Sequence, residues 1–276
     1  MILKKSLKTY LNVFPLAFST AKTLSHSLAY FPYRFSGGID HVFDNETHLK
    51  LRSFINFLDK SLENGFTFAY NNLLDGLQSK DLDFLNQNFE NRFFSKIESF
   101  PSELDSNNLE LQLYDHKNDE IEVFFSEMSM ILGVRLQRDS NPKGLFKNNL
   151  KPDRMVKFML YTPNKSFFLA ASQMTDIRPL LQIPVVFRSR KKLFLKRKNE
   201  EVSKGKIGEE ECHKVVFECE GANLAQTSLF GEMVKFAGRG IRKEHEMGDI
   251  FHKFFFTKES EWKITDIDNF MEGNEF

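Results

Sequence analysis

The region from 47 to 78 carries an apolar residue at every third or fourth position, which is the spacing of one helix face. The members of this face are Leu51, Ile55, Leu58, Leu62, Phe66, Ala69, Leu73 and Leu77. They predict one long amphipathic helix, or two helices interrupted near Gly65. A second helix is predicted over 82–97, with Ser79 or Asp81 as its N-cap and an end before Pro101.

After Pro101 the apolar period changes to two, which is typical of β-strands with one buried face. The strands predicted from this alternation lie at 109–113, 128–136, 185–198, 213–220, 252–257 and 262–267. The last two are separated by four residues, the length of a hairpin loop, and 199–211 is expected to be a longer loop between strands. The proline-rich region 141–183 is expected to combine loops with one or two short strands.

Helices grouped before strands predict an α+β fold. We expect the N-terminal amphipathic helices to pack on one face of a curved, mainly antiparallel sheet with a cone-like shape. Neither an internal repeat nor an interdomain linker is recognisable, so residues 40–276 are predicted to form a single domain.

Residues 1–39 differ from the rest because they contain five basic residues and no acidic one before Asp40. An apolar helical face is also present, although Pro15 kinks or ends it; its members are Leu3, Leu7, Leu11, Phe14 and Phe18. A basic, acid-free amphipathic leader is typical of a mitochondrial transit peptide. A secretory signal and an ordered arm lying on a partner or a membrane remain as alternatives.

Composition narrows the class of protein. The chain has 276 residues, 41% of them apolar, with 38 basic and 38 acidic residues. A full hydrophobic core is therefore expected, and the balanced charge makes nucleic acid an unlikely partner. Two cysteines are too few for a disulfide framework or a four-thiolate zinc site. No apolar run is long enough for a transmembrane helix, so any membrane contact is expected to be peripheral.

Motifs for nucleophilic catalysis and phosphate binding are absent from the sequence. Gly238-Arg239-Gly240 could form an anion nest, but a flexible loop is the better interpretation. Cys212 and Cys219 are seven positions apart, whereas paired zinc ligands are usually two to four positions apart. On a strand, this odd offset would place the two side chains on opposite faces. His213 lies between them, and His245 and His252 follow later in the chain. The two cysteines are expected to be a buried or half-exposed pair, and no cofactor or metal is predicted.

Asp266 and Asp268 stand near the end of the last predicted strand. Their even offset would put both carboxylates on one face, where mutual repulsion could raise one pKa for acid or base catalysis. Exposed aspartates that keep a strand edge soluble are the commoner case and our expectation.

The strongest charge feature is a cationic cluster, which is interleaved with apolar residues and contains no acid. Its members are Arg188, Arg190, Lys191, Lys192, Lys196, Arg197 and Lys198. A solvated cationic strand is one interpretation. The functional interpretation is attraction to an anionic surface, with each basic residue contributing about 1 kcal/mol near acidic lipid. RNA phosphate would be attracted by the same electrostatics.

The order of elements, and a few segments, resemble the Tim-forty-four-like domain of mitochondrial inner-membrane proteins. The matching segments are the last strand, Glu261-Trp262-Lys263-Ile264-Thr265-Asp266-Ile267-Asp268, the aromatic segment 252–257, and the helix junction from Asn71 to Leu85. The resemblance covers about residues 50–276. It implies the nuclear-transport-factor-two-like cone fold and a matrix-side domain that lies on cardiolipin-containing membrane and holds other proteins.

These observations predict a non-enzymatic scaffold or accessory subunit on the matrix face of the mitochondrial inner membrane. Its partners would be other subunits of a respiratory-chain or ATP-synthase-type complex, with the cationic cluster toward lipid or an acidic neighbour. One alternative is a membrane anchor for the protein-import motor or the mitochondrial ribosome. Another is a small-molecule isomerase or dehydratase of the cone fold, with Asp266 or Asp268 as the acid or base.

Overall fold

The computed structural model describes residues 45–114, 120–133, 146–148, 156–161, 178–198, 210–223, 244–256, 261–268 and 270. The helices are α5 (Asn45–Leu58), α6 (Leu62–Ser79), α7 (Leu82–Asn88), α8 (Asn91–Ile97), α9 (Phe100–Ser106) and α13 (Glu244–Phe255). The strands are β1 (Leu109–Tyr114), β2 (Glu122–Phe125), β3 (Met128–Gly133), β4 (Phe146–Asn148), β5 (Val156–Tyr161), β6 (Leu180–Ser189), β7 (Lys192–Arg197), β8 (Glu211–Glu220) and β9 (Trp262–Ile267). The predicted arm 1–39 and the Gly238-Arg239-Gly240 segment lie outside these ranges.

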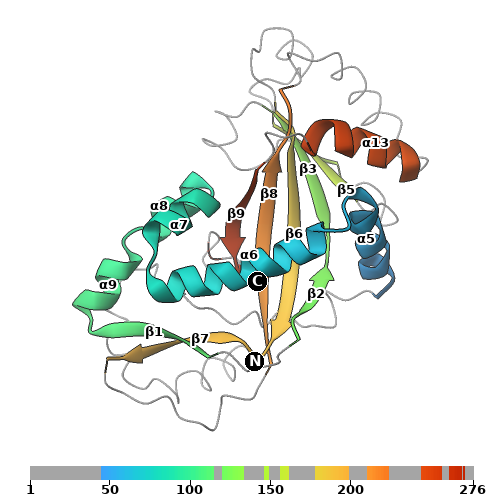
Figure 1. Ribbon diagram of the computed structural model, residues 1–276. Helices are drawn as coiled ribbons and strands as arrows, with labels where there is room; N and C mark the ends of the chain where they lie inside the picture. Colours follow the sequence, from blue (N-terminus) through green and yellow to red (C-terminus); the bar gives the residue numbers. More distant parts are fainter. Residues whose placement is uncertain are drawn as a thin grey trace, which may run out of the picture.

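The described strands form two sheets (Figure 1). The larger has the order β4-β5-β3-β6-β8-β9, with β2 also paired to β6, and all its pairs are antiparallel except β3 with β5. The smaller pairs β1 with β7. The prediction of an α+β fold, with helices before a mainly antiparallel sheet, is therefore confirmed, and the larger sheet is not closed. The strands β4 and β5 also confirm that the 141–183 region contains short strands.

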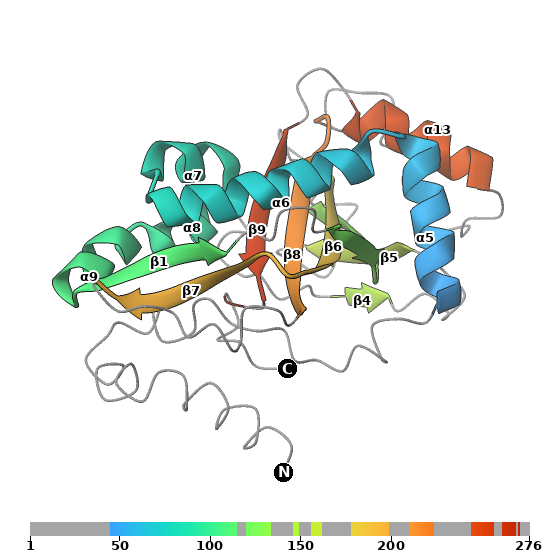
Figure 2. The ribbon, with the colours of Figure 1, turned by 60° about the horizontal axis from the view of Figure 1, so that its bottom comes forward.

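The helix α6 crosses one face of the larger sheet (Figure 2). Two aromatic stacks hold it there. The Phe66 ring stacks on Phe217 of β8 at a centroid distance of 4.5 Å, and the Tyr70 ring stacks on Phe187 of β6 at 4.3 Å. All four side chains are buried, so each stack removes two large apolar surfaces from water in addition to the ring contact.

Helix boundaries differ from the prediction where side chains bond to the local backbone. The long helix is interrupted at Asp59, whose carboxylate accepts hydrogen bonds from the N–H and hydroxyl of Ser61, and not at Gly65. Asp81 is the N-cap of α7 as predicted, accepting from the Phe84 N–H at 3.0 Å. The predicted second helix is divided into α7 and α8. Pro101 lies in the first turn of α9, where its missing N–H costs nothing.

The strand predicted over 185–198 is two strands in two sheets. β6 pairs with β8 along ten residues, and after a bend at Arg190 and Lys191 the chain continues as β7, which leaves the larger sheet and pairs with β1. The Ser189 hydroxyl donates to the Lys191 carbonyl at 3.1 Å and satisfies a backbone acceptor inside this bend. The alternation of apolar and polar residues continues through the bend, so the sequence pattern does not indicate that the chain passes from one sheet to the other.

The strand predicted over 252–257 is wrong, because residues 252–255 form the last turn of α13. Phe251, Phe254 and Phe255 are fully buried at helical spacing, and the Phe251 ring lies 5.6 Å from that of Phe54 on α5. The run of aromatic residues favoured a strand by intrinsic propensity, but tertiary packing determines a helix here. The predicted hairpin with 262–267 is therefore absent, and β9 pairs instead with β8.

Two glycines of α6 are expected to respond oppositely to alanine. A Cβ at Gly65 would have no heavy atom within 4 Å, whereas a Cβ at Gly76 would lie 2.8 Å from the Phe84 ring. Gly65→Ala should therefore raise the free energy of unfolding by about 0.5–1 kcal/mol through helix propensity alone. Gly76→Ala should lower it by about 1–2 kcal/mol through overpacking. Urea unfolding of both variants measures this, and a loss of stability in Gly65→Ala would contradict the open space at that site.

Stability should also depend on the protonation of His48. Its Nδ1 accepts a hydrogen bond from the Phe125 N–H at 3.1 Å, which requires a neutral ring, and burial together with the Arg52 charge lowers its pKa from 6.5. As the pH falls below about 6.5, the unfolded chain takes up a proton that the folded chain resists, so the free energy of unfolding decreases. In His48→Asn, whose amide oxygen keeps the acceptor, this part of the pH dependence should vanish. Denaturant unfolding between pH 7.5 and 5 compares the two proteins, and equal slopes would refute the assignment.

Candidate functional site

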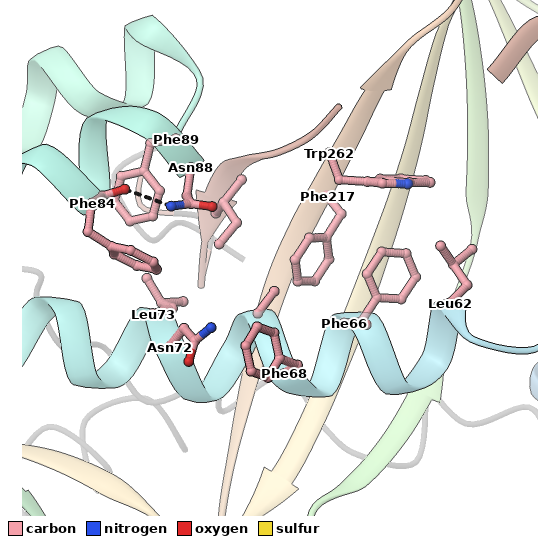
Figure 3. Close-up of a pocket in the computed structure, with 13 residues that line it drawn as sticks. Leu62, Phe66, Phe68, Asn72, Leu73, Phe84, Asn88, Phe89, Phe217 and Trp262 are labelled. Carbon is pink, nitrogen blue, oxygen red and sulfur yellow. Dashed lines mark hydrogen bonds between the residues drawn. The ribbon is translucent and has the colours of Figure 1, made fainter. Parts of the chain in front are cut away.

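A pocket of about 190 Å³ lies between α6, α7 and the strands β8 and β9 (Figure 3). Its walls are mainly aromatic. Phe66 forms one wall with Phe217, on which it stacks, and with Trp262, whose ring it meets edge-on at a centroid distance of 5.2 Å. Phe84 and Phe89 of the α7 segment form the opposite wall. The helix α7 packs against α6 and against β9. Between α6 and α7, part of β8 and β9 is left uncovered, and this is the floor of the pocket.

The polar groups of this pocket are neutral. Asn72 of α6 and Asn88 of α7 both line it, and none of the residues that line it is titratable in the physiological range. The Asn88 amide nitrogen donates to the Phe84 carbonyl at 2.8 Å, so its oxygen points the other way, toward β9 (Figure 3). Phe68 stands at the rim with 69% of its surface exposed. The arrangement can hold an uncharged, mostly apolar group.

The two aspartates proposed from sequence do not share one exposed face. Asp266 is partly buried, and its carboxylate accepts from the Ile267 N–H at 2.9 Å. Asp268 follows the end of β9 with a left-handed φ of 51° and is only 2% exposed, so the expectation of a solvent-exposed strand end is wrong for it. Side chains alternate between the two faces of a sheet only while the backbone is extended, so the even offset from Asp266 does not determine where the Asp268 side chain lies. Neither aspartate is among the residues that line the pocket.

Asp268 instead forms a buried polar cluster with His213 beneath α6. Its carboxylate lies 2.9 Å from His213 Nδ1 and accepts from the Lys214 N–H at 2.7 Å. Burial raises the pKa of Asp268, and the neighbouring His213 opposes that shift. Tyr70 lies against the same cluster, with its ring 6.3 Å from that of His213, and burial raises its pKa as well. These groups have the chemistry of an acid–base pair, but α6 covers them.

The cationic cluster is divided between the end of β6 and β7, and most of it is paired with acids. Arg188 binds Glu122 and lies over the Phe124 ring, and Lys196 lies 3.0 Å from Glu110. Further ion pairs join Arg190 to Glu210 at 3.7 Å and Lys198 to Asp105 at 3.1 Å.

Three members of the cluster remain, and the side chain of one of them, Lys192, lies outside the part of the chain that the structure describes. Lys191 is only 8% exposed, and its ammonium donates to the Asn71 side chain at 3.0 Å, with Asp75 at 3.6 Å. Arg197 is partly exposed, and no ion pair joins it to the described residues. Any contact with an anionic surface would therefore depend on members of the cluster other than Lys191.

The two cysteines lie on different sides of β8. Cys212 and Cys219 are both buried and form no disulfide with each other, and they belong to different apolar clusters, as their odd spacing predicts. The side chain of His245 lies outside the described residues. Within the described ranges, no group of three or more histidine, cysteine or acidic side chains is placed to hold a metal ion. His252 lies exposed on α13, apart from His213.

Sequence reasoning identified Phe66 and Leu73 as part of a buried helix face, but it missed the pocket and the buried pair. The pocket needs α7 and β9 in place, and these are distant in sequence. One local sign existed: Phe68 is a large apolar residue that falls off the predicted apolar face of its helix.

No known protein family and no curated protein matches this chain. The helices that the structure describes are each too short or too polar to cross a bilayer.

The buried pair should contribute strongly to stability. Asp268→Ala would leave the Lys214 N–H without its acceptor and place a Cβ-only side chain in a left-handed conformation, so we expect a loss of roughly 2–4 kcal/mol. Asp268→Asn keeps an acceptor oxygen and tolerates that conformation, so it should lose only about 1 kcal/mol. Urea unfolding distinguishes the variants, and an equal small loss in both would show that the cluster is not held by this carboxylate.

Proposed function

We propose that this protein is a non-enzymatic scaffold or accessory subunit that binds other proteins through its N-terminal helices. One observation carries the proposal. Among the described residues, the large apolar side chains that are exposed all lie on α5, α6 and α7; they are Leu49, Phe57, Phe68 and Leu82. Large apolar side chains left exposed on three helices that follow one another in the chain are candidate contacts for protein partners. The pocket beside Phe68 adds apolar surface without a titratable group.

The setting we propose is the matrix face of the mitochondrial inner membrane, within a respiratory-chain or ATP-synthase-type complex. The basic, acid-free leader 1–39 supports import, and the resemblance of the last strand to Tim-forty-four-like domains supports the complex. Part of that resemblance is lost, since segment 252–257 does not supply a strand. A cone-like curvature of the sheet remains part of the proposal. Arg197 and its partly exposed neighbours on β7 would face cardiolipin headgroups or an acidic partner.

An isomerase or dehydratase is the second candidate, and the His213–Asp268 pair favours it. A buried carboxylate beside an imidazole is a suitable proton relay. The acid or base of such an enzyme must, however, reach its substrate, and neither residue lines the pocket. The separation of the acid–base pair from the open pocket therefore favours binding over catalysis. An anchor for the import motor or the mitochondrial ribosome would use the same helical surface and differs only in the partner.

Native complexes from mitochondria of the source cells test this proposal. The tagged wild-type chain should migrate with a large membrane complex, identified by mass spectrometry. Phe68→Glu places a charge on the most exposed of these apolar positions, so most of that chain should shift to a small species. Asn91→Asp adds the same charge at an exposed position on α8 and should migrate as the wild type does.

The complex that co-migrates decides between the scaffold proposals. A respiratory-chain or ATP-synthase complex supports the accessory subunit, and the translocase or the ribosome replaces it with an anchor. A wild-type chain that migrates alone, or a chain outside mitochondria, would overturn the proposal and favour the enzyme.

A further inference from the structure

We propose that the pocket between α6, α7 and β9 is a binding site for a small molecule with one aromatic ring and one hydrogen-bonding substituent such as a hydroxyl. Phe68 belongs both to this pocket and to the proposed protein-binding surface, but the inference does not depend on the proposed function, because it rests on the lining residues and is tested by ligand binding alone. The lining residues, their distances and the open position at Gly65 carry it.

The size of the pocket matches one ring. Its volume is about 190 Å³. An engineered cavity of about 150 Å³ lined by apolar side chains stays dry and binds benzene. The pocket here therefore has room for a benzene-sized ring with a small substituent.

The walls favour an aromatic ring over an aliphatic group. Phe66, Phe217 and Trp262 already lie in stacked and edge-to-face arrangements with centroid distances of 4.5 and 5.2 Å, and a further ring would extend this cluster. Aromatic pairs at such distances gain interaction energy beyond the burial of apolar area. Because no lining residue is charged at neutral pH, a charged ring would lose its hydration without a partner.

Two carboxamides define where the polar substituent lies. The Asn88 oxygen faces away from the Phe84 carbonyl that holds its amide nitrogen, so it can accept a hydrogen bond from a ligand hydroxyl. Asn72 also lines the pocket and makes no side-chain hydrogen bond to the described residues, so its amide is available as well. Both belong to the helices α6 and α7, which places the polar end of the ligand on the side of the helix pair.

Entry is possible at Gly65. No heavy atom lies within 4 Å of the Cβ position of this residue, although it lines the pocket. A large side chain at this position would project into the open space and occupy the site. Leucine is also a much better helix former than glycine, so Gly65→Leu should block the pocket without weakening α6.

The test uses the purified full chain with 4-fluorophenol and with fluorobenzene, which lacks the hydroxyl. Binding is followed by fluorine NMR and by the fluorescence of Trp262, the chain's single tryptophan and part of the pocket wall. Saturable binding of both is expected, with 4-fluorophenol about tenfold tighter because of its hydrogen bond. Gly65→Leu should remove binding of both, and Asn88→Ala should reduce the preference for the phenol to about twofold or less.

Several results would overturn the inference. They are an absence of saturable binding to the wild-type chain, equal affinity for the two probes, and binding that survives Gly65→Leu with the wild-type constant. The unfolding midpoint of each variant, measured in parallel, confirms that a lost signal reflects a blocked pocket and not an unfolded chain. The migration of the protein in native complexes does not enter this test, so either proposal can fail without the other.

Discussion

The stacking of α6 on the larger sheet is the interaction on which the rest of the structure depends. Phe66 and Tyr70 lie one helical turn apart and fix the helix on two adjacent strands, β8 and β6, through Phe217 and Phe187. Two anchors on different strands determine both the position and the direction of the helix. The pocket on one side of α6 and the buried polar cluster beneath it follow from that placement.

Because of this position of α6, the titratable pair His213–Asp268 is buried, whereas the open pocket contains no titratable group. The groups that could transfer protons, His213 and Asp268, are sealed under α6, where burial raises the pKa of Asp268 and makes its pairing necessary. The open pocket holds aromatic rings and neutral carboxamides. Within the described residues, the acid–base pair and the open pocket are therefore separate features, and α6 lies between them.

The local sequence pattern predicted an element correctly where the structure of that element depends mainly on residues close to it in the chain. The α6 face, the Asp81 cap and the strand at 262–267 are of this kind. Segment 252–257 was misassigned because residues 252–255 belong to α13, a helix that packs against α5 with the Phe251 ring beside Phe54. That contact cannot be seen in the local pattern. Asp268 is buried in a left-handed conformation, and the register of β9 on β8 shifts between Val216 and Phe217. Neither is encoded in an alternation of apolar and polar residues.

The basic run at 188–198 has a different electrostatic environment in the folded protein than its sequence indicates. Along the sequence, 188–198 is a basic run without an acid, but pairing with β1, β2 and α9 brings Glu110, Glu122 and Asp105 to its side chains. Lys80 and Lys198 both approach Asp105, which lowers the pKa of that carboxyl and keeps it ionised. Each such pair subtracts from the field that a distant lipid or RNA would experience. Among the described residues, only Arg197 of this run has no ion pair, so a count of basic residues overstates the attraction of this surface for anions.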